Sequence, residues 1–394
     1  MERSCFRICS QTETRKLKTE QTHLFIMKNI LQLTGILILT VLWTACESDY
    51  RPMSVGQVDE VFVVMDSTEW DSDTALAIEE TFGKGIETLP SYEPTYRLTF
   101  KDFASNEDLD ELRQYKNLIF ASPIGDDDNV ANLIKAILSD DVEERVRAGE
   151  SFAFPLEDRW VRDQWVLILT SNSDDELAEK IRNSEESLVG NLMQEEFERR
   201  EYEIYRRGEQ TEISDSLWQN YGWQVRMQHD YIWTVKEEDA AVFRRYLPEN
   251  DRWIMTWWKE DVPSADFIDD EWINATRDSL LEKYMRGERE DSYLTTEYSS
   301  QRNVITKEME TDNRLTGFET LGTWKMTNDF MGGPFVNFVY HDPATDRLFM
   351  IEYGQFAPGV SKRRFVRQFR TMGRTFESDS TWNTEADPVA VSQP

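Results

Sequence analysis

Cysteine and histidine are scarce in this sequence, which has three of each among 394 residues. The cysteines are Cys5, Cys9 and Cys46, and the leader described below predicts that the mature chain begins at Cys46. Such a chain can form no internal disulfide bond, and it offers no free thiol nucleophile and no set of cysteine ligands for zinc. His229 and His341 then remain as the histidines, and their spacing indicates no metal site. We therefore predict neither a metal ion nor another cofactor.

Basic residues are also few, because 44 Lys and Arg stand against 75 Asp and Glu and give a formal net charge of −31. Binding to nucleic acid depends on neutralising phosphates with Lys and Arg, so this balance argues against a nucleic-acid partner. Hydrophobic residues make up 39% of the chain, which excludes a wholly disordered protein, and the length fits two domains. The sequence contains no GxSxG, Walker, GxGxxG or HExxH motif, which argues against a common enzyme class.

The strongest motif lies near the N-terminus, where the chain from Met27 reads MKNILQLTGILILTVLWTAC. Lys28 precedes an apolar run from Ile30 to Trp43. This run is shorter than the about 20 residues that span a bilayer. Its length and flanks are typical of a signal peptide, which we place at residues 27–45. Residues 1–26 precede a complete leader, so we interpret them as an incorrectly assigned extension.

The small residues Thr44 and Ala45 stand directly before Cys46. This pattern resembles the lipobox of bacterial lipoproteins, although Trp43 replaces the usual Leu. The resemblance implies that Cys46 is the lipidation site, carries acyl chains such as palmitate and becomes the mature N-terminus. An ordinary signal peptide cut at another small residue and an N-terminal hydrophobic anchor are the alternatives.

The rest of the chain predicts an α+β fold with two related halves. A polar tether over 46–57 leads into a first half at 58–207, a second half follows at 208–376, and 377–394 reads as a disordered tail. We expect each half to form a mainly antiparallel sheet with helices packed on one side. The main helices are predicted at 129–147, 174–207, 237–246, 270–285 and 361–376, and the clearest hairpin joins strands at 151–156 and 165–170.

A short motif occurs in both halves. Glu69-Trp70 and the apolar positions after it reappear around Glu271-Trp272, each time in a segment predicted to be helical and ended by glycine. We interpret this repeat as an internal duplication, with a chance match as the alternative.

Two further segments carry candidate ligand contacts. Trp253 and Trp257 fall on one face of a predicted strand, where their rings could stack on sugars, although a strand buried on both faces is the favoured interpretation. Gly332 and Gly333 precede a proline, and this turn could line a cleft or simply fix the entry to the next strand.

Several acidic residues could form a cation-binding or catalytic site, but each set also has an explanation that needs no such site. Asp126, Asp127 and Asp128 precede a predicted helix, where capping explains them better than cation binding. Two neighbouring pairs could serve glycoside hydrolysis, but so many acids make such pairs uninformative; the pairs are Glu157 with Asp158 and Asp269 with Glu271.

The closing helix concentrates basic residues in an otherwise acidic chain. Arg363, Arg364 and Arg367 belong to a run without an intervening acid. Such a cluster needs anionic partners. These are either acidic groups of the same fold or an external glycan, lipid head group or acidic protein.

The lipobox and three further segments, VFVVMDSTEW, LPSYEP and MGGPF, together resemble an uncharacterised family of Bacteroidota envelope lipoproteins, the domain of unknown function DUF4837. This resemblance implies a location at the outer membrane, on either its periplasmic or its surface face, but no mechanism. We expect a non-enzymatic binding or assembly protein that is attached to the membrane by its acyl chains and binds an envelope protein or glycan. The alternative is a glycan-active hydrolase that uses an Asp/Glu pair.

Overall fold

The structure is a computed structural model and describes residues 50–89, 91–248, 250–299, 303–309, 311 and 315–382. The predicted extension, the signal peptide, Cys46 and the last part of the predicted tail lie outside these residues. The described residues from Met53 onward belong to one compact unit. Within the described part of the chain, no helix combines the length and the apolar character needed to cross a bilayer.

The first domain is built on a five-stranded sheet with the order β2-β1-β3-β5-β4. Four strands run parallel and β4 runs antiparallel beside β5. The strands are β1 (Glu60–Val64), β2 (Arg97–Lys101), β3 (Asn117–Ala121), β4 (Ala153–Glu157) and β5 (Trp165–Leu169). The predicted hairpin is confirmed as β4–β5, but the expected mainly antiparallel sheet is wrong for this half.

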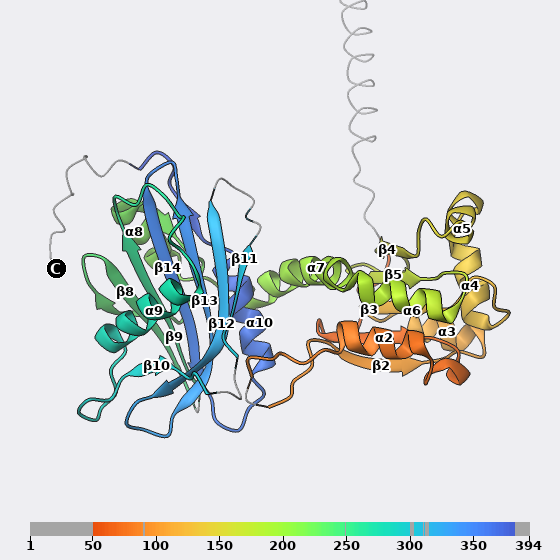
Figure 1. Ribbon diagram of the computed structural model, residues 1–394, viewed down its shortest axis with the longest axis horizontal. Coiled ribbons are helices and arrows are strands. Elements are labelled where there is room, and N and C mark those ends of the chain that lie inside the picture. The colour runs from red at the N-terminus through yellow and green to blue at the C-terminus, as the bar shows by residue number, and fades with distance from the viewer. Residues whose placement is uncertain are drawn as a thin grey trace, which may run out of the picture. The chain divides into compact units, whose positions relative to one another are not determined.

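Helices cover both faces of this sheet (Figure 1). Val61 and Val63 of β1 pack towards α2, α6 and α7, whereas Phe62 and Val64 pack towards α3, α4 and α5. The helices are α2 (Asp73–Phe82), α3 (Asn106–Leu112), α4 (Asn129–Ile137), α5 (Asp140–Arg147), α6 (Asp174–Asn183) and α7 (Glu185–Tyr205), with the short 3-10 helix η1 (Ser67–Glu69) before α2. A sheet covered on both faces explains the unbroken apolar runs in β1, β3 and β5.

The second domain is an antiparallel sheet with the order β10-β12-β13-β14-β9-β8-β7, in which β11 also pairs with β12. The strands are β7 (Ile232–Lys236), β8 (Ala240–Leu247), β9 (Asn250–Lys259), β10 (Leu294–Thr296), β11 (Ile305–Met309), β12 (Thr316–Met326), β13 (Gly332–Asp342) and β14 (Arg347–Phe356). β6 (Trp223–Gln224) and β15 (Glu377–Ser378) pair separately. Residues 240–247 form β8, so the helix predicted at 237–246 is wrong.

Helices lie on both faces of the second sheet as well (Figure 1). Phe365 and Phe369 of α10 (Arg363–Gly373) and Leu217 of α8 (Thr211–Tyr221) pack on one face. Ile273 and Leu281 of α9 (Asp270–Tyr284) pack on the other. The α+β architecture in two parts is therefore confirmed, whereas the expectation of helices on one side only is wrong for both halves.

The two domains are not copies of one fold, because their sheets differ in strand order and in strand direction. Glu69 and Trp70 lie at the end of η1 and its C-cap, ahead of α2, whereas Glu271 and Trp272 belong to the first turn of α9. The shared letters therefore occupy different structural positions, and the duplication hypothesis is wrong.

Two predicted helices are each divided in the structure. The segment 129–147 forms α4 and α5, and the segment 174–207 forms α6 and α7. Serines mark both divisions, because Ser139 is the N-cap of α5 and Ser184 separates α6 from α7. Serine favours helix ends over helix interiors since its hydroxyl competes for backbone hydrogen bonds.

Candidate functional site

The two tryptophans proposed as a sugar platform belong to the packed sheet. Trp253 is 3% exposed and contacts the Trp324 ring at 5.0 Å between centroids. Trp257 is half-buried and its indole nitrogen donates to Asp239 at 3.2 Å. Both rings pack in the core beneath α9, so the structure leaves Trp253 no face for a ligand.

The two glycines proposed near a cleft permit close strand packing. A Cβ atom at Gly333 would lie 2.1 Å from the carbonyl oxygen of Gln355, and one at Gly332 would lie 2.9 Å from the carbonyl oxygen of Trp324. Both residues begin β13. Glycine is therefore required here by the backbone of neighbouring strands, and neither residue lines a pocket described below.

The arginines of the closing helix divide into two groups. Arg363 pairs with Asp59 at 2.6 Å, and Arg367 forms a bidentate pair with the buried Glu196. Burial alone would lower the pKa of Arg367, but the Glu196 carboxylate outweighs burial and raises it. These two arginines therefore have partners inside the fold. Arg364 is exposed and makes no ion pair with a described carboxylate.

Two of the acidic candidates, Asp128 and Asp269, are helix caps. Asp128 is the N-cap of α4 and accepts hydrogen bonds from two backbone amides, at 2.7 and 2.8 Å, so the capping interpretation is confirmed. Asp269 caps α9 in the same way and accepts from the Trp272 amide at 2.8 Å. Over the described ranges, no group of three His, Cys, Asp or Glu side chains is arranged to hold a metal ion.

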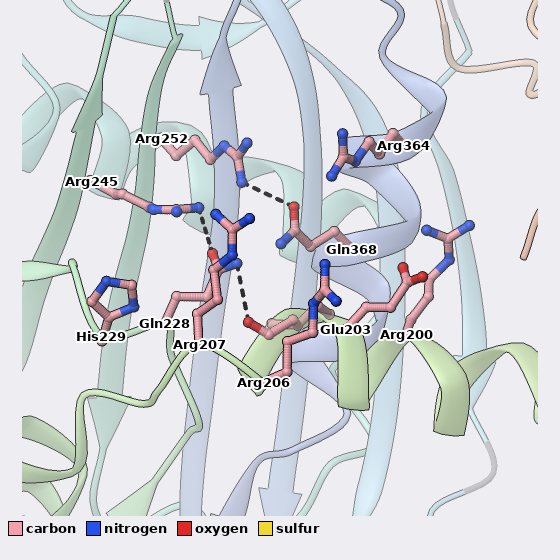
Figure 2. Close-up of a pocket in the computed structure, with 11 residues that line it drawn as sticks. Arg200, Glu203, Arg206, Arg207, Gln228, His229, Arg245, Arg252, Arg364 and Gln368 are labelled. Atoms are coloured by element: carbon pink, nitrogen blue, oxygen red, sulfur yellow. Dashed lines mark hydrogen bonds between the residues drawn. The ribbon is translucent and has the colours of Figure 1, made fainter. Parts of the chain in front are cut away.

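A basic pocket of about 200 Å³ lies between the C-terminal end of α7, the strands β8 and β9, and α10. It is far larger than the roughly 10–15 Å³ that one water needs. Figure 2 shows guanidinium groups entering it from each of these elements. We call it the arginine pocket, and its lining comprises Arg200, Glu203, Ile204, Arg206, Arg207, Gln228, His229, Arg245, Arg252, Arg364 and Gln368.

The strands bring two of these arginines together against their mutual repulsion. Arg245 in β8 and Arg252 in β9 lie directly opposite each other in the antiparallel register. They share the face that packs under α10, because their neighbours in the register, Phe243 and Ile254, belong to that core. Like charges at directly opposed positions destabilise a sheet. The pair therefore concentrates positive charge at a cost in stability.

Arg252 is the most unusual member of the pocket. The residue is 8% exposed, and its guanidinium donates hydrogen bonds to the side-chain oxygens of Gln368 at 3.0 Å and Asn250 at 3.3 Å. The guanidinium carbon lies 4.6 Å from the centre of the Phe365 ring. Within the part of the chain that the structure describes, it forms no ion pair with a carboxylate. The pKa of Arg252 is lowered to about 10, mainly by burial; the cations of Arg245 and Arg364 add to this lowering, whereas Tyr231 and Asp230 oppose it.

The remaining arginines differ in how far they are neutralised. Arg200 pairs with Glu196, and Arg245 pairs with Asp230 at 2.6 Å. The side chains of three others make no hydrogen bond or ion pair with described residues; they are Arg206, Arg207 and Arg364. Arg206 and Arg207 follow the end of α7, where the helix dipole favours cations. The helix dipole therefore explains how the fold accommodates these two cations, but it does not neutralise them, so their charge remains available to bind an anion.

The chemistry of the pocket is suited to binding an anion. Guanidinium groups present planar forks of N–H donors and stay protonated at neutral pH, so they neutralise and orient carboxylates or phosphates but do not transfer protons. Gln228 and Gln368 add amide groups to the wall. His229 is exposed at the pocket edge, whereas His341 is buried elsewhere with its Nε2 atom 2.7 Å from the Val262 carbonyl oxygen.

Sequence reasoning identified Arg364 but missed its partners in the pocket. Arg245 lies in the segment that was predicted to be a helix, and only the strand β8 places it opposite Arg252. The dibasic pairs Arg206-Arg207 and Arg244-Arg245 in so acidic a chain were a usable signal. Their convergence depends on tertiary packing and cannot be read from spacing.

Comparisons with known proteins address the two domains separately. Residues 210–375 match the family model described as Domain of unknown function (DUF4837). The second domain is therefore similar to this family. Residues 54–205 match another model, described as Domain of unknown function (DUF8532). The resemblance to DUF4837 is therefore confirmed for the second domain, which contains MGGPF, whereas VFVVMDSTEW and LPSYEP lie within the DUF8532 match.

Other comparisons add little to these family matches. No curated protein matches the chain. Among solved structures, a point mutant of the protein Mog1 matches with 9% identity and a TM-score of 0.28, over 41% of this chain and 92% of that chain. A likeness at this level carries no statement about fold or function.

Proposed function

We propose that the protein is a lipid-anchored binding protein of the bacterial cell envelope and that it holds an anionic ligand in the arginine pocket. The observation that carries the binding function is the state of Arg252, which is buried, positively charged and not paired with a carboxylate among the described residues. Removing a charge from water costs several kcal/mol unless an opposite charge compensates. A bound anion would supply that compensation, and the other lining arginines would contribute to its affinity.

The proposed location rests on the leader that ends at Cys46 and on the family resemblance. With a formal net charge of −31, the protein would be repelled by an anionic membrane surface. Attachment therefore has to come from acyl chains, each buried CH₂ of which contributes about 0.8 kcal/mol. We place the protein at the outer membrane, where acylated Cys46 would hold the two domains beside the bilayer.

Thermal unfolding in the presence of different anions tests the binding function. The full-length protein, purified in detergent, would be heated with citrate, sulfate or phosphate at constant ionic strength. A ligand present at 100 times its Kd stabilises the folded state by about 2.7 kcal/mol. We expect at least one multivalent anion to raise the unfolding temperature of the wild type.

Two variants show whether such an effect comes from the pocket. Arg252→Met should abolish the stabilisation by the anion. Arg244→Met is the matched control, because Arg244 is the next residue to Arg245 in β8, does not line the pocket, and pairs with Asp251 at 3.2 Å. It should respond to the anion like the wild type. If no anion stabilises the wild type, or if both variants respond equally, the proposed function is wrong.

A further inference from the structure

The charge balance of the arginine pocket indicates a ligand with more than one negative charge. Four lining arginines have no acidic partner within the described part of the chain, and they are Arg206, Arg207, Arg252 and Arg364. Glu203 is the single carboxylate among the lining residues. The excess of three positive charges is poorly matched by a monocarboxylate. A tetrahedral dianion compensates two of them and offers several oxygens to the guanidinium donors.

Glu203 would favour hydrogenphosphate over sulfate, because only hydrogenphosphate carries a proton that it can donate to a carboxylate. At neutral pH an ionised carboxylate is only an acceptor of hydrogen bonds. Hydrogenphosphate keeps one proton on an oxygen and can donate it to Glu203. Sulfate has no such proton, and a phosphate ester, whose second pKa is about 6, has lost it above neutral pH. Next to either of these ions Glu203 would repel the bound anion, and no hydrogen bond between them would offset that repulsion.

We propose that the arginine pocket binds free hydrogenphosphate and that Glu203 selects it by accepting its proton in a hydrogen bond. This inference rests on the proposed function, since it specifies the anion that the same pocket holds. The buried Arg252 and the unpaired Arg364 line the pocket from β9 and α10, and Glu203 lines it from α7 (Figure 2). A phosphate bound in this pocket would meet several guanidinium donors and one carboxylate acceptor.

Isothermal titration calorimetry of the full-length protein in detergent at pH 7.5 tests the selection. The probes are inorganic phosphate, sulfate and glycerol 3-phosphate, each at the same ionic strength. We expect phosphate to bind about tenfold more tightly than sulfate and than the ester, the ratio that one hydrogen bond of ordinary strength provides. Glu203→Gln should bring the three affinities to within about threefold of each other, because the amide can donate to any of these oxygens.

Glu198→Gln is the matched control, because Glu198 is exposed on the same helix and does not line the arginine pocket. It should keep the wild-type preference for phosphate. If sulfate or the ester binds the wild type as tightly as phosphate does, or if Glu203→Gln leaves the preference unchanged, this inference is overturned while anion binding stands. Phosphatidic acid in the same detergent binding more tightly than inorganic phosphate would likewise overturn it in favour of a lipid head group. If none of the probes binds, the hydrogenphosphate inference falls, and the anion survey described above decides whether the proposed function falls with it.

Discussion

Replacing Arg252 with methionine should make the ligand-free protein more stable, although it removes a large, well-packed side chain. Burial and neighbouring cations lower the pKa of Arg252 from 12.5 to about 10. At about 1.36 kcal/mol for each pKa unit, keeping this group charged in the folded protein at pH 7 costs roughly 3 kcal/mol. Methionine has a similar length and carries no charge.

Part of this gain is offset by lost contacts. Arg252 gives up its hydrogen bonds to Gln368 and Asn250 and its contact with the Phe365 ring. Hydrogen bonds of this kind contribute about 0.5–1.5 kcal/mol each. We therefore expect Arg252→Met to raise the free energy of unfolding by up to about 2 kcal/mol in the absence of a ligand. Replacing buried charged residues with apolar side chains has raised the stability of other proteins by amounts of this order.

Scanning calorimetry in an anion-poor buffer measures this effect, with Arg244→Met as the control. Arg244 belongs to a half-exposed ion pair, so its replacement should change the stability by no more than about 1 kcal/mol. If Arg252→Met lowered the free energy of unfolding by more than about 2 kcal/mol, the claim that Arg252 destabilises the ligand-free fold would be refuted. Such a loss would mean that Arg252 stabilises the fold and is not kept at a cost for a ligand.

Four other substitutions have definite expected outcomes. Burial alone would raise the pKa of Glu319, but Arg370 lowers it below 4.5, so this ion pair adds stability above pH 4.5 that is lost as the pH falls through the lowered pKa. Urea unfolding should therefore show that the stability difference between the wild type and Arg370→Met shrinks from pH 7 to pH 3. A difference that stays constant would contradict this. Gly333→Ala should destabilise the protein by about 1–3 kcal/mol, because its Cβ atom would overlap a neighbouring strand. Gly125→Ala, with nothing within 4 Å of the added atom, should change the stability by about 0.5 kcal/mol or less, and equal effects would contradict the packing argument. Cys46→Ser should release the protein from the membrane fraction and remove the acyl mass from its N-terminus, whereas unchanged fractionation would contradict lipid anchoring.

Sequence patterns predicted individual elements better than their arrangement. The helix predicted at 361–376 is confirmed as α10, whose Phe365, Phe369 and Met372 pack into the core. The hairpin predicted at 151–156 and 165–170 is confirmed as β4 and β5. Strand direction is not encoded in periodicity, so the parallel order of the first sheet was missed. An unbroken apolar run does, however, indicate a strand covered on both faces, and this signal argued against helices on one side only.

The arginine pocket illustrates why the candidate site was only partly predictable. Arg363, Arg364 and Arg367 lie close together in the sequence, but helical geometry directs Arg363 and Arg367 towards acids of the fold and leaves Arg364 at the pocket. The opposite placement of Arg245 and Arg252 requires the register of β8 and β9. Spacing predicts which residues share a helix face, whereas the convergence of several elements depends on packing.

A crystal structure of the protein grown with inorganic phosphate is the most direct test of phosphate binding in the arginine pocket. We expect tetrahedral density there, with an oxygen about 3 Å from the guanidinium of Arg252 and another within hydrogen-bond distance of Glu203. A pocket that holds only water at saturating phosphate, or a carboxylate of the chain itself seated against Arg252, would contradict it.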